Sequence, residues 1–131
     1  MMINKKLFPF QNPLIVALDV DTDQEALGLV EELYDLVGGF KVGPRLNLRY
    51  GSELIQKISK RAPVFVDNKH FDIPTTMEAA VRASFESGAS LVTIHALSGL
   101  ESLKKMADLE IELSQIRPFR ILGVTTLPLG L

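Results

Sequence analysis

Short apolar segments alternate along the chain with longer segments in which apolar residues recur every three or four positions. The mainly apolar segments are residues 14–20, 40–43, 64–66, 90–95 and 120–125. Such runs are typical of buried strands, and the longer spacing is typical of amphipathic helices. A strand and a helix therefore repeat roughly every 25 to 30 residues. This alternation predicts an α/β fold with a parallel sheet and right-handed crossovers.

Polar residues and glycines indicate where the predicted helices begin. A capping box pairs Ser or Thr with Glu three residues later. The chain has three such pairs, which are Thr22 with Glu25, Thr75 with Glu78, and Ser98 with Glu101. The remaining helix is predicted to follow Gly51, and the last helix is predicted to become less regular from Leu109 to Ile116.

Charged and polar side chains close the apolar segments at their carboxyl ends. They are Asp19, Lys41, Asp67, Lys69, Thr93 and His95. In a (β/α)8 barrel such residues line the interior, and the rim at the strands' carboxyl ends carries the site. In a doubly wound sheet, the alternative, polar residues would gather on fewer strands near a switch point. Because the polar residues end four of the predicted strands, the pattern favours part of a barrel over a doubly wound sheet.

The most informative stretch is residues 64–76, where a buried-strand pattern turns into a charged one. Asp67 and Lys69 share one face of the strand, and Asp72 follows after the chain has turned. Unit charges ~4 Å apart interact by ~4 kcal/mol at an effective dielectric constant of ~20. Two carboxylates beside one lysine would therefore be strongly coupled, as at functional sites. A solvated salt bridge of little energetic value is the alternative.

Composition bounds the class of protein. The 131 residues, 47% hydrophobic and 23% charged, predict one soluble domain with an N-terminal arm at residues 1–12. A net charge of −2 argues against a nucleic-acid partner, although it allows a local pocket for one phosphate. No apolar stretch predicts a signal peptide or a membrane span. The chain has no Cys, so thiolate metal sites are excluded and a reducing cytoplasm fits.

The motif Asp-x-Lys-x-x-Asp-Ile-Pro at residues 67–74 resembles that of the orotidine 5′-phosphate decarboxylase family. Supporting segments are residues 17–19, 40–43 and 93–96, and the resemblance runs from Pro13 to about Leu127. It implies a (β/α)8 barrel, present here from the first to the fifth strand. It also implies decarboxylation of orotidine 5′-phosphate to UMP in pyrimidine synthesis, in a cytoplasmic homodimer without a metal or other cofactor.

The resemblance implies roles for particular residues. Lys69 would donate a proton to C6 of the pyrimidine, Asp67 would face the departing carboxylate, and Lys41 would pair with Asp67. Asp72 would enter the site of the neighbouring subunit. Substrate-binding positions are Asp19 for the ribose hydroxyls, Ile73 and Thr76 beside Asp72, and His95 as support. His95 as a hydrogen-bonded core residue and Asp19 as a helix-entry residue remain open alternatives.

The implied chemistry agrees with these residue types. Loss of carbon dioxide from C6 leaves a carbanion with no conjugated group to accept the charge. An ammonium held at that carbon stabilises the negative charge and then supplies the proton.

The chain departs from the family pattern in two places. His70 precedes Phe71, the reverse of the usual order, and Thr75 stands where Asn is common. Residues 128–131 stand where a Thr-Ser pair is expected. A barrel of this kind has ~250 residues, and this chain lacks its last three β-α units, which carry the phosphate-binding residues in the family. Truncation, a frameshift or a split gene would all fit. We expect the chain to be inactive alone; a non-catalytic fragment and a metal-dependent sugar-phosphate decarboxylase are the competing hypotheses.

Overall fold

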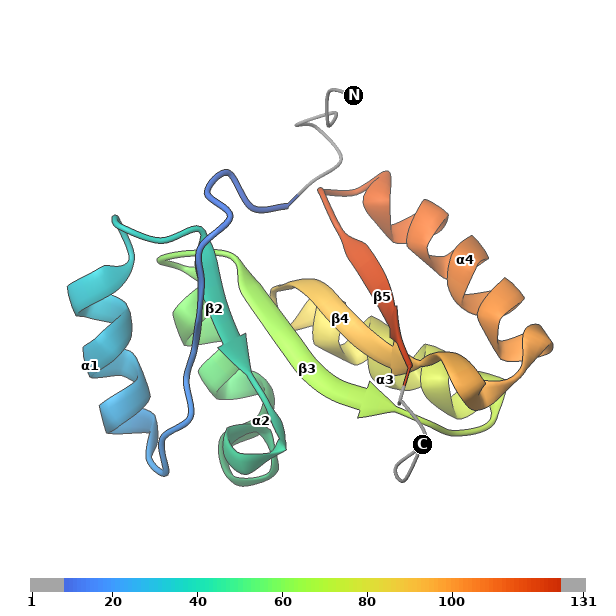
Figure 1. Ribbon diagram of the computed structural model, residues 1–131, viewed down its shortest axis with the longest axis horizontal. Helices are drawn as coiled ribbons and strands as arrows, with labels where there is room; N and C mark the ends of the chain where they lie inside the picture. Colours follow the sequence, from blue (N-terminus) through green and yellow to red (C-terminus); the bar gives the residue numbers. More distant parts are fainter. Residues whose placement is uncertain (1–8, 126–131) are drawn as a thin grey trace, which may run out of the picture.

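The computed structural model describes residues 9–125 of the chain, in which strands and helices alternate throughout (Figure 1). The strands are β1 (Ile15–Ala17), β2 (Gly39–Val42), β3 (Val64–His70), β4 (Ala89–His95) and β5 (Arg120–Val124). The helices are α1 (Asp23–Leu33), α2 (Pro44–Ser59), α3 (Pro74–Glu86) and α4 (Leu100–Ser114), with a short 3-10 turn, η1 (Ala96–Ser98), before α4. No helix among the described residues is long and apolar enough to cross a membrane.

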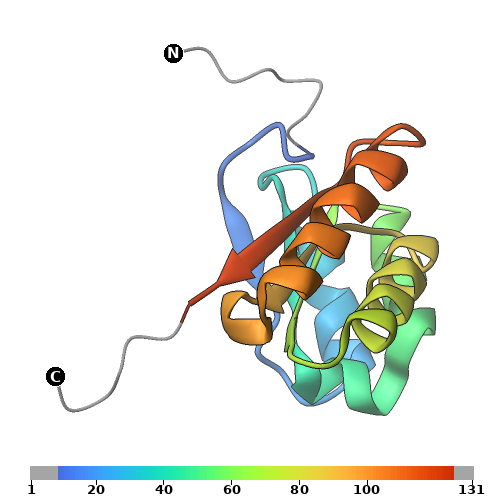
Figure 2. The same cartoon turned by 90° about the vertical axis from the view of Figure 1, so that its right-hand side faces the viewer.

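The five strands form one parallel sheet in the order β1-β2-β3-β4-β5. The spatial order equals the chain order, so the sheet has no reversal of the kind that defines a switch point in a doubly wound fold. The helices lie together on one side of the sheet, and the other side carries none of them (Figure 2). This is the winding of a (β/α)8 barrel, with β1 and β5 at the two edges.

The hydrophobic core lies between the sheet and its helices. Strand residues that point toward the helices are 0–1% exposed, namely Phe40, Val42, Val64, Val66 and Val92. They pack with buried residues of the helices such as Ile58 of α2 and Met77 of α3. Because side chains alternate along a strand, this packing leaves Lys41 and Asp67 on the opposite, open face.

One of the three predicted capping boxes is confirmed. Thr22 is the N-cap of α1, and its Oγ1 accepts a hydrogen bond from the Glu25 N–H at 3.1 Å. The other two predictions were wrong, because α3 begins at Pro74 after the N-cap Ile73, and α4 begins after Gly99. Proline is favoured in the first helical turn, where its missing N–H costs nothing. Gly99 has a φ of 107°, which favours glycine.

The bounds of other elements also differ from the sequence prediction. Helix α2 already begins at Pro44, and Gly51, with φ 59° and ψ −143°, marks a kink inside it rather than its start. Helix α4 stays regular to Ser114, because Leu109 and Leu113 are buried in the core. Strand β1 is shorter than predicted and pairs with β2 only through Ala17, although the Leu18 N–H still bonds the Lys41 carbonyl.

The described end of the predicted N-terminal arm packs against the domain. Phe10 is only 3% exposed, and a Cβ at Gly39 would lie 2.5 Å from its ring. A Cβ at Gly38 would lie 1.7 Å from the backbone oxygen of Asn12. Both glycines are therefore needed for this close approach, in addition to ending the segment after α1. Residues 1–8 of the arm lie outside the described part.

Candidate active site

One carboxylate at the end of β3 pairs with two lysines. Oδ2 of Asp67 lies 3.0 Å from Nζ of Lys69, which leaves the same strand, and 3.5 Å from Nζ of Lys41 on β2. The Asp67 side chain is 11% exposed, compared with 34% for Lys41 and 54% for Lys69. The parallel register, which sets Ala17 beside Lys41 and Lys41 beside Phe65, brings these carboxyl ends to one rim of the sheet.

A buried hydroxyl completes the cluster. Thr93 of β4 is 1% exposed, and its Oγ1 donates to Oδ1 of Asp67 at 2.8 Å and accepts from the Lys69 N–H at 3.0 Å. Thr93 was among the polar residues predicted at the strands' carboxyl ends, but the sequence assigned it no role in the site. The signal was its position on the polar face, two residues before a candidate.

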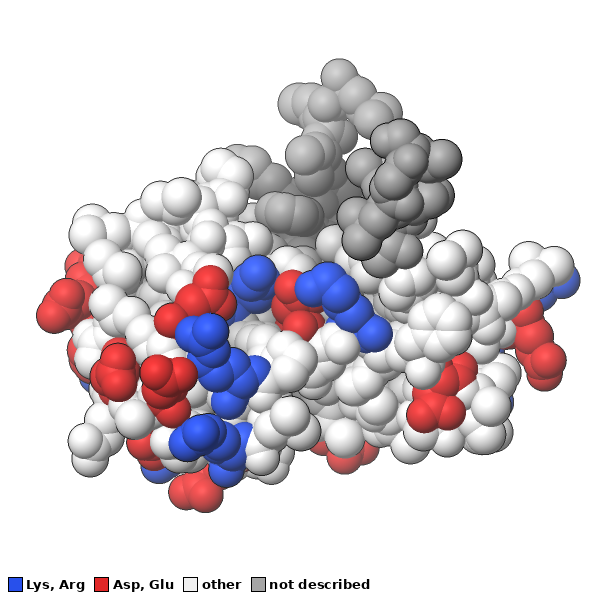
Figure 3. Space-filling model, turned by 60° about the horizontal axis from the view of Figure 1, so that its bottom comes forward, with Lys and Arg blue, Asp and Glu red and all other residues white. Residues whose placement is uncertain are grey.

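The surroundings hold Asp67 in its charged form. Burial by itself raises the pKa of Asp67, but hydrogen bonds from Thr93 and Lys69 and the charges of Lys69 and Lys41 outweigh it, so the pKa lies below its ordinary value. Basic and acidic side chains are intermingled on the face onto which the strands' carboxyl ends open (Figure 3). The rim thus holds one deprotonated carboxylate beside two lysine side chains.

The backbone at Lys69 is unusual. Lys69 has a φ of 48°, and it is the one residue other than glycine with positive φ in the described part of the chain. The register between β3 and β4 also shifts between Val66 and His70. Bulges and left-handed residues of this kind re-aim side chains and are concentrated at functional sites. Here the conformation turns the Lys69 side chain back toward Asp67.

Asp72 lies apart from this cluster in the single chain. It is exposed, and its Oδ1 accepts a hydrogen bond from the Ile73 N–H at 2.7 Å. The sequence predicted Lys41 beside Asp67 and a second carboxylate, Asp72, beside Lys69. The structure shows the Lys41–Asp67 pair, whereas no ion pair joins Asp72 to Lys69 among the described residues. The difference arises because residues after His70 leave the strand before Pro74 starts α3, which directs Asp72 away from the sheet. Its predicted role in a neighbouring subunit stays a prediction.

The remaining predicted site residues lie along the same rim without a direct contact to Asp67. Asp19 is exposed after β1, and its backbone oxygen accepts from Nη1 of Arg45 at 3.2 Å. Ile73 is 63% exposed, and Thr76 is exposed in the first turn of α3. All three side chains are exposed to solvent.

His95 has local partners within its own loop. Its Nδ1 accepts a hydrogen bond from the Leu97 N–H at 3.2 Å, and its ring centroid lies 4.9 Å from that of Phe71. His95 thus has the hydrogen bond of the alternative interpretation, but it is half-buried and lies outside the core. A supporting role beside a ligand stays a prediction.

Two polar residues of β3 face the helices behind the candidate site. Asn68 accepts a hydrogen bond from Nδ2 of Asn47 in α2 at 2.9 Å. Nε2 of His70 is buried and has no hydrogen-bond partner within the described residues. Burial lowers the pKa of His70, and the charge of Asp72 only partly opposes this. His70 is thus held neutral next to Lys69.

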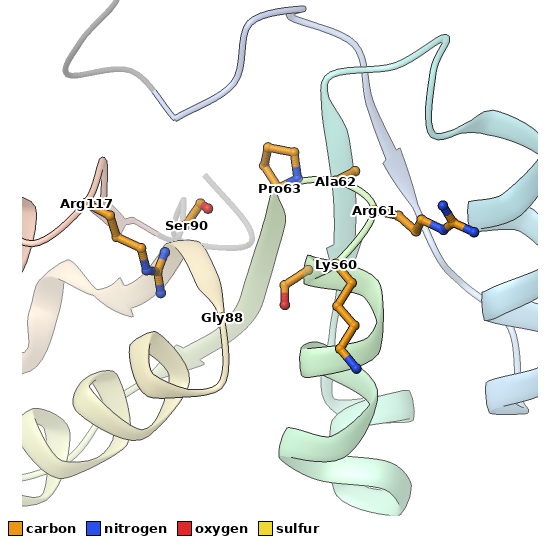
Figure 4. A pocket seen from close by; sticks show the side chains of 8 residues that line it. Lys60, Arg61, Ala62, Pro63, Gly88, Ser90 and Arg117 are labelled. Carbon is orange, nitrogen blue, oxygen red and sulfur yellow. The ribbon is translucent and has the colours of Figure 1, made fainter.

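One cavity of the described residues lies away from this cluster. A cavity of about 450 Å³ lies at the amino-terminal ends of β3 and β4, where Arg117, Lys60 and Arg61 are among the lining residues (Figure 4). Arg61 instead pairs with Glu31 at 2.7 Å, and the Arg117 guanidinium lies 4.1 Å over the Phe85 ring and donates to the Phe85 carbonyl. We place the site at the carboxyl-end rim, because the charged cluster is there and the barrel's opposite face usually serves stability.

The described residues contain no group of three or more His, Cys, Asp or Glu side chains that could hold a metal ion.

Comparison with known proteins supplies the family. Residues 12–115 match the model of the "Orotidine 5'-phosphate decarboxylase / HUMPS family". The chain belongs to this family. The orotidine 5′-phosphate decarboxylase of Carboxydothermus hydrogenoformans is 44% identical over 92 residues, which is 70% of this chain and 38% of the relative. That of Saccharophagus degradans is 37% identical over 115 residues, which is 87% of this chain and 48% of the relative.

Solved structures of the family confirm the fold prediction. The Methanocaldococcus jannaschii decarboxylase complexed with the inhibitor BMP has a TM-score of 0.72 and 34% identity, and the match covers 79% of this chain and 49% of that one. The Lactobacillus acidophilus decarboxylase has a TM-score of 0.76 and 30% identity, with 89% and 54% covered. The chain therefore spans about half the length of its relatives, and its five strands match about half of their barrels.

Proposed function

We propose that this chain supplies the catalytic half of an orotidine 5′-phosphate decarboxylase site. The observation that carries the proposal is the Asp67 carboxylate held between the ammonium groups of Lys69 and Lys41 on the open face of the sheet. Relatives of this chain bear that name, and one of them binds the inhibitor BMP. The family is one of decarboxylating enzymes, and the assignment of the reaction to this chain is the proposal.

In the proposed reaction, the bond between C6 and the carboxylate carbon breaks and its electron pair stays on C6. The ammonium of Lys69 stabilises this charge and then transfers a proton to C6, which gives UMP and carbon dioxide. Asp67, whose pKa is lowered, stays anionic and faces the departing carboxylate. Lys41 balances the charge of Asp67 while Lys69 loses its proton.

The other rim residues are proposed to bind the nucleotide. Asp19 would accept hydrogen bonds from the ribose hydroxyls, and Thr76 and Ile73 would line the site from the start of α3. Asp72 would reach the site of a second subunit in a homodimer, which fits its exposed position outside the Asp67 cluster. His95 would support the loop after β4 through its bond with the Leu97 N–H.

Turnover is proposed to require more of the barrel than these five strands. The chain covers 38% to 48% of the two relatives compared above, so their remaining β-α units have no counterpart in the match. Binding energy from the phosphate, remote from C6, would come from those units. Such remote binding energy lowers the barrier at the reacting carbon, so its loss reduces kcat as well as affinity.

The test mixes the purified chain with a polypeptide covering the rest of the Saccharophagus degradans relative. Loss of orotidine 5′-phosphate is followed by its ultraviolet absorbance, with and without a chelator. We expect no turnover by the chain alone, turnover by the mixture, and no effect of the chelator. Turnover that the chelator abolishes would contradict the expected metal-free reaction. A mixture that forms a stable complex but never turns over would contradict the proposal.

A further inference from the structure

A single hydroxyl on β4 connects the two charged residues of β3. Thr93 Oγ1 accepts from the Lys69 N–H at 3.0 Å and donates its proton to Oδ1 of Asp67 at 2.8 Å. A hydroxyl has one proton to donate and lone pairs to accept, so both bonds can exist at once. Because Thr93 is 1% exposed, water has little access to replace either bond. Amide, hydroxyl and carboxylate thus form one directed chain of hydrogen bonds.

This connection lies where β3 departs from regular pairing. The register with β4 shifts between Val66 and His70, and Lys69 adopts a φ of 48°. Lys69 lies inside this interval, and its N–H donates to the Thr93 side chain. A residue other than glycine holds such a conformation only where its surroundings enforce it. The threonine side chain suits this task because its branched Cβ restricts χ1.

The two oxygens of Asp67 have different partners. Oδ2 faces the ammonium groups of Lys69 and Lys41, at 3.0 Å and 3.5 Å. Oδ1 is held by Thr93 alone among the hydrogen bonds of the described residues. Without the hydroxyl, the carboxylate could rotate away from the lysines, and the left-handed turn at Lys69 would lose its anchor.

We propose that Thr93 is a positioning residue of the candidate site, which holds the bulge at Lys69 and the orientation of the Asp67 carboxylate. Its effect on turnover rests on the proposed function, whereas its effect on the backbone of β3 does not. The hydrogen bond from Thr93 is also a main cause of the lowered pKa of Asp67. A variant without the hydroxyl would therefore hold the charged carboxylate less firmly.

The test compares three variants of the full chain. Thr93→Val keeps the branched shape but removes the hydroxyl, and Thr93→Ser keeps the hydroxyl. Ser84→Ala is the matched control, because Ser84 is a buried hydroxyl on α3 that donates to the Ala80 carbonyl at 3.0 Å, outside the site. Hydrogen exchange of the Lys69 amide is measured by mass spectrometry with residue-level fragmentation.

We expect the Lys69 amide to be protected in the unmodified chain. It should exchange about tenfold faster in Thr93→Val, and near the unmodified rate in Thr93→Ser and Ser84→Ala. In the complemented decarboxylase, Thr93→Val should lower kcat about tenfold with little change in KM, and move the acid limb of the pH profile upward. Thr93→Ser should recover most of that loss.

Several results would overturn the proposal. One is a Lys69 amide that exchanges freely in the unmodified chain. Another is a Lys69 amide that exchanges equally fast in Thr93→Val and in the unmodified chain, while the rest of β3 stays protected. If Thr93→Val fails to fold, Thr93→Ser decides: retained Lys69 protection supports the proposal and lost protection refutes it. Absence of turnover in every complemented sample would count against the proposed function, while the exchange result would still judge Thr93.

Discussion

The candidate site consists of a few charged side chains at the carboxyl ends of β2 and β3. Asp67 is largely buried, yet its pKa lies below the ordinary value because Thr93 and the two lysines favour the anion. Lys69 has its backbone in the left-handed region, and its Nζ lies 3.0 Å from Oδ2 of Asp67.

Replacing Lys69 with Ala should abolish turnover in the complemented decarboxylase and leave folding nearly unchanged. The Lys69 side chain is 54% exposed, so it contributes charge and a proton rather than packing. The control is Lys60→Ala, because Lys60 is exposed and lies at the opposite end of the strands. The complemented enzyme with Lys60→Ala should keep normal turnover. The ultraviolet assay measures both, and circular dichroism checks the fold. Near-normal turnover by Lys69→Ala would exclude it as the proton donor.

The free energy of unfolding should fall as the pH drops below 6.5, the ordinary pKa of histidine. The pKa of His70 is lowered in the folded chain, so the unfolded chain binds more protons in this range, and acid favours unfolding. The loss should continue until the pH reaches the lower, folded pKa. His70→Gln should remove this dependence above pH ~5, whereas His95→Gln should retain it.

Urea unfolding followed by circular dichroism at several pH values is the appropriate measurement, because the chain has no Trp to serve as a fluorescent probe. The two variants are compared at equal concentration, so that any association affects both equally. An equally steep pH dependence in the unmodified chain and in His70→Gln would show that the histidine is not responsible.

At the scale of elements, a capping motif in the sequence did not always mark the residue at which a helix begins. The Thr22 motif is a real cap, because its hydroxyl faces the Glu25 N–H. The similar motif at Thr75 lies inside α3, after Pro74 has already begun the helix.

Ion pairs that join Arg82 of α3 to Glu112 of α4 are exposed and tie neighbouring helices at the surface.

These two threonines give a matched test of the fold. Thr22→Ala should lower the free energy of unfolding by about 1 kcal/mol, the usual cost of losing an N-cap side chain. Thr75→Ala should change it much less, because Thr75 is exposed and no cap bond involves it in the described structure. Urea unfolding at neutral pH measures both. Equal losses from the two substitutions would contradict the assigned helix starts.

At the scale of the whole molecule, the sheet has two open edges and one uncovered face. Strands β1 and β5 each pair with one neighbour in the described structure. Glu110 accepts a hydrogen bond from the Ile121 N–H at 2.7 Å, so one backbone group of β5 is already occupied. Apolar side chains near the edges are also exposed, such as Leu14 at 58% and Leu122 at 47%. Edges of this kind readily pair with other chains.

We therefore expect the chain by itself to associate, with a mass in solution above the 14.5 kDa of one copy. Leu122→Lys should reduce the association, because it places a charge on the open side of β5. Ile116→Lys is the control, since Ile116 is 70% exposed after α4 and outside the sheet. Size-exclusion chromatography with light scattering measures the mass. A stable monomer with full turnover would refute this expectation and the need for further barrel units.

Much of the fold and part of the site could be predicted because the signals are local. The burial of alternate residues such as Phe40 and Val42 requires only the period of a strand, and the crossover helices follow from their own spacing. The same alternation put Lys41, Asp67 and Lys69 on one face, and the family motif at residues 67–74 indicated their chemistry. The limited reach of β1 and the kink at Gly51 were missed, because they depend on contacts with other elements.

The sequence by itself determined the order of strands and helices, the burial of the aliphatic faces and the clustering of charge at the end of β3. Only the tertiary structure decided that Thr93 joins Asp67 to the Lys69 backbone and that Asp72 lies outside the cluster. The physical reason is that a strand's periodicity is a property of neighbouring residues in the chain. A hydrogen bond between strands instead depends on their register, and here the register shifts at a bulge that the sequence pattern does not reveal.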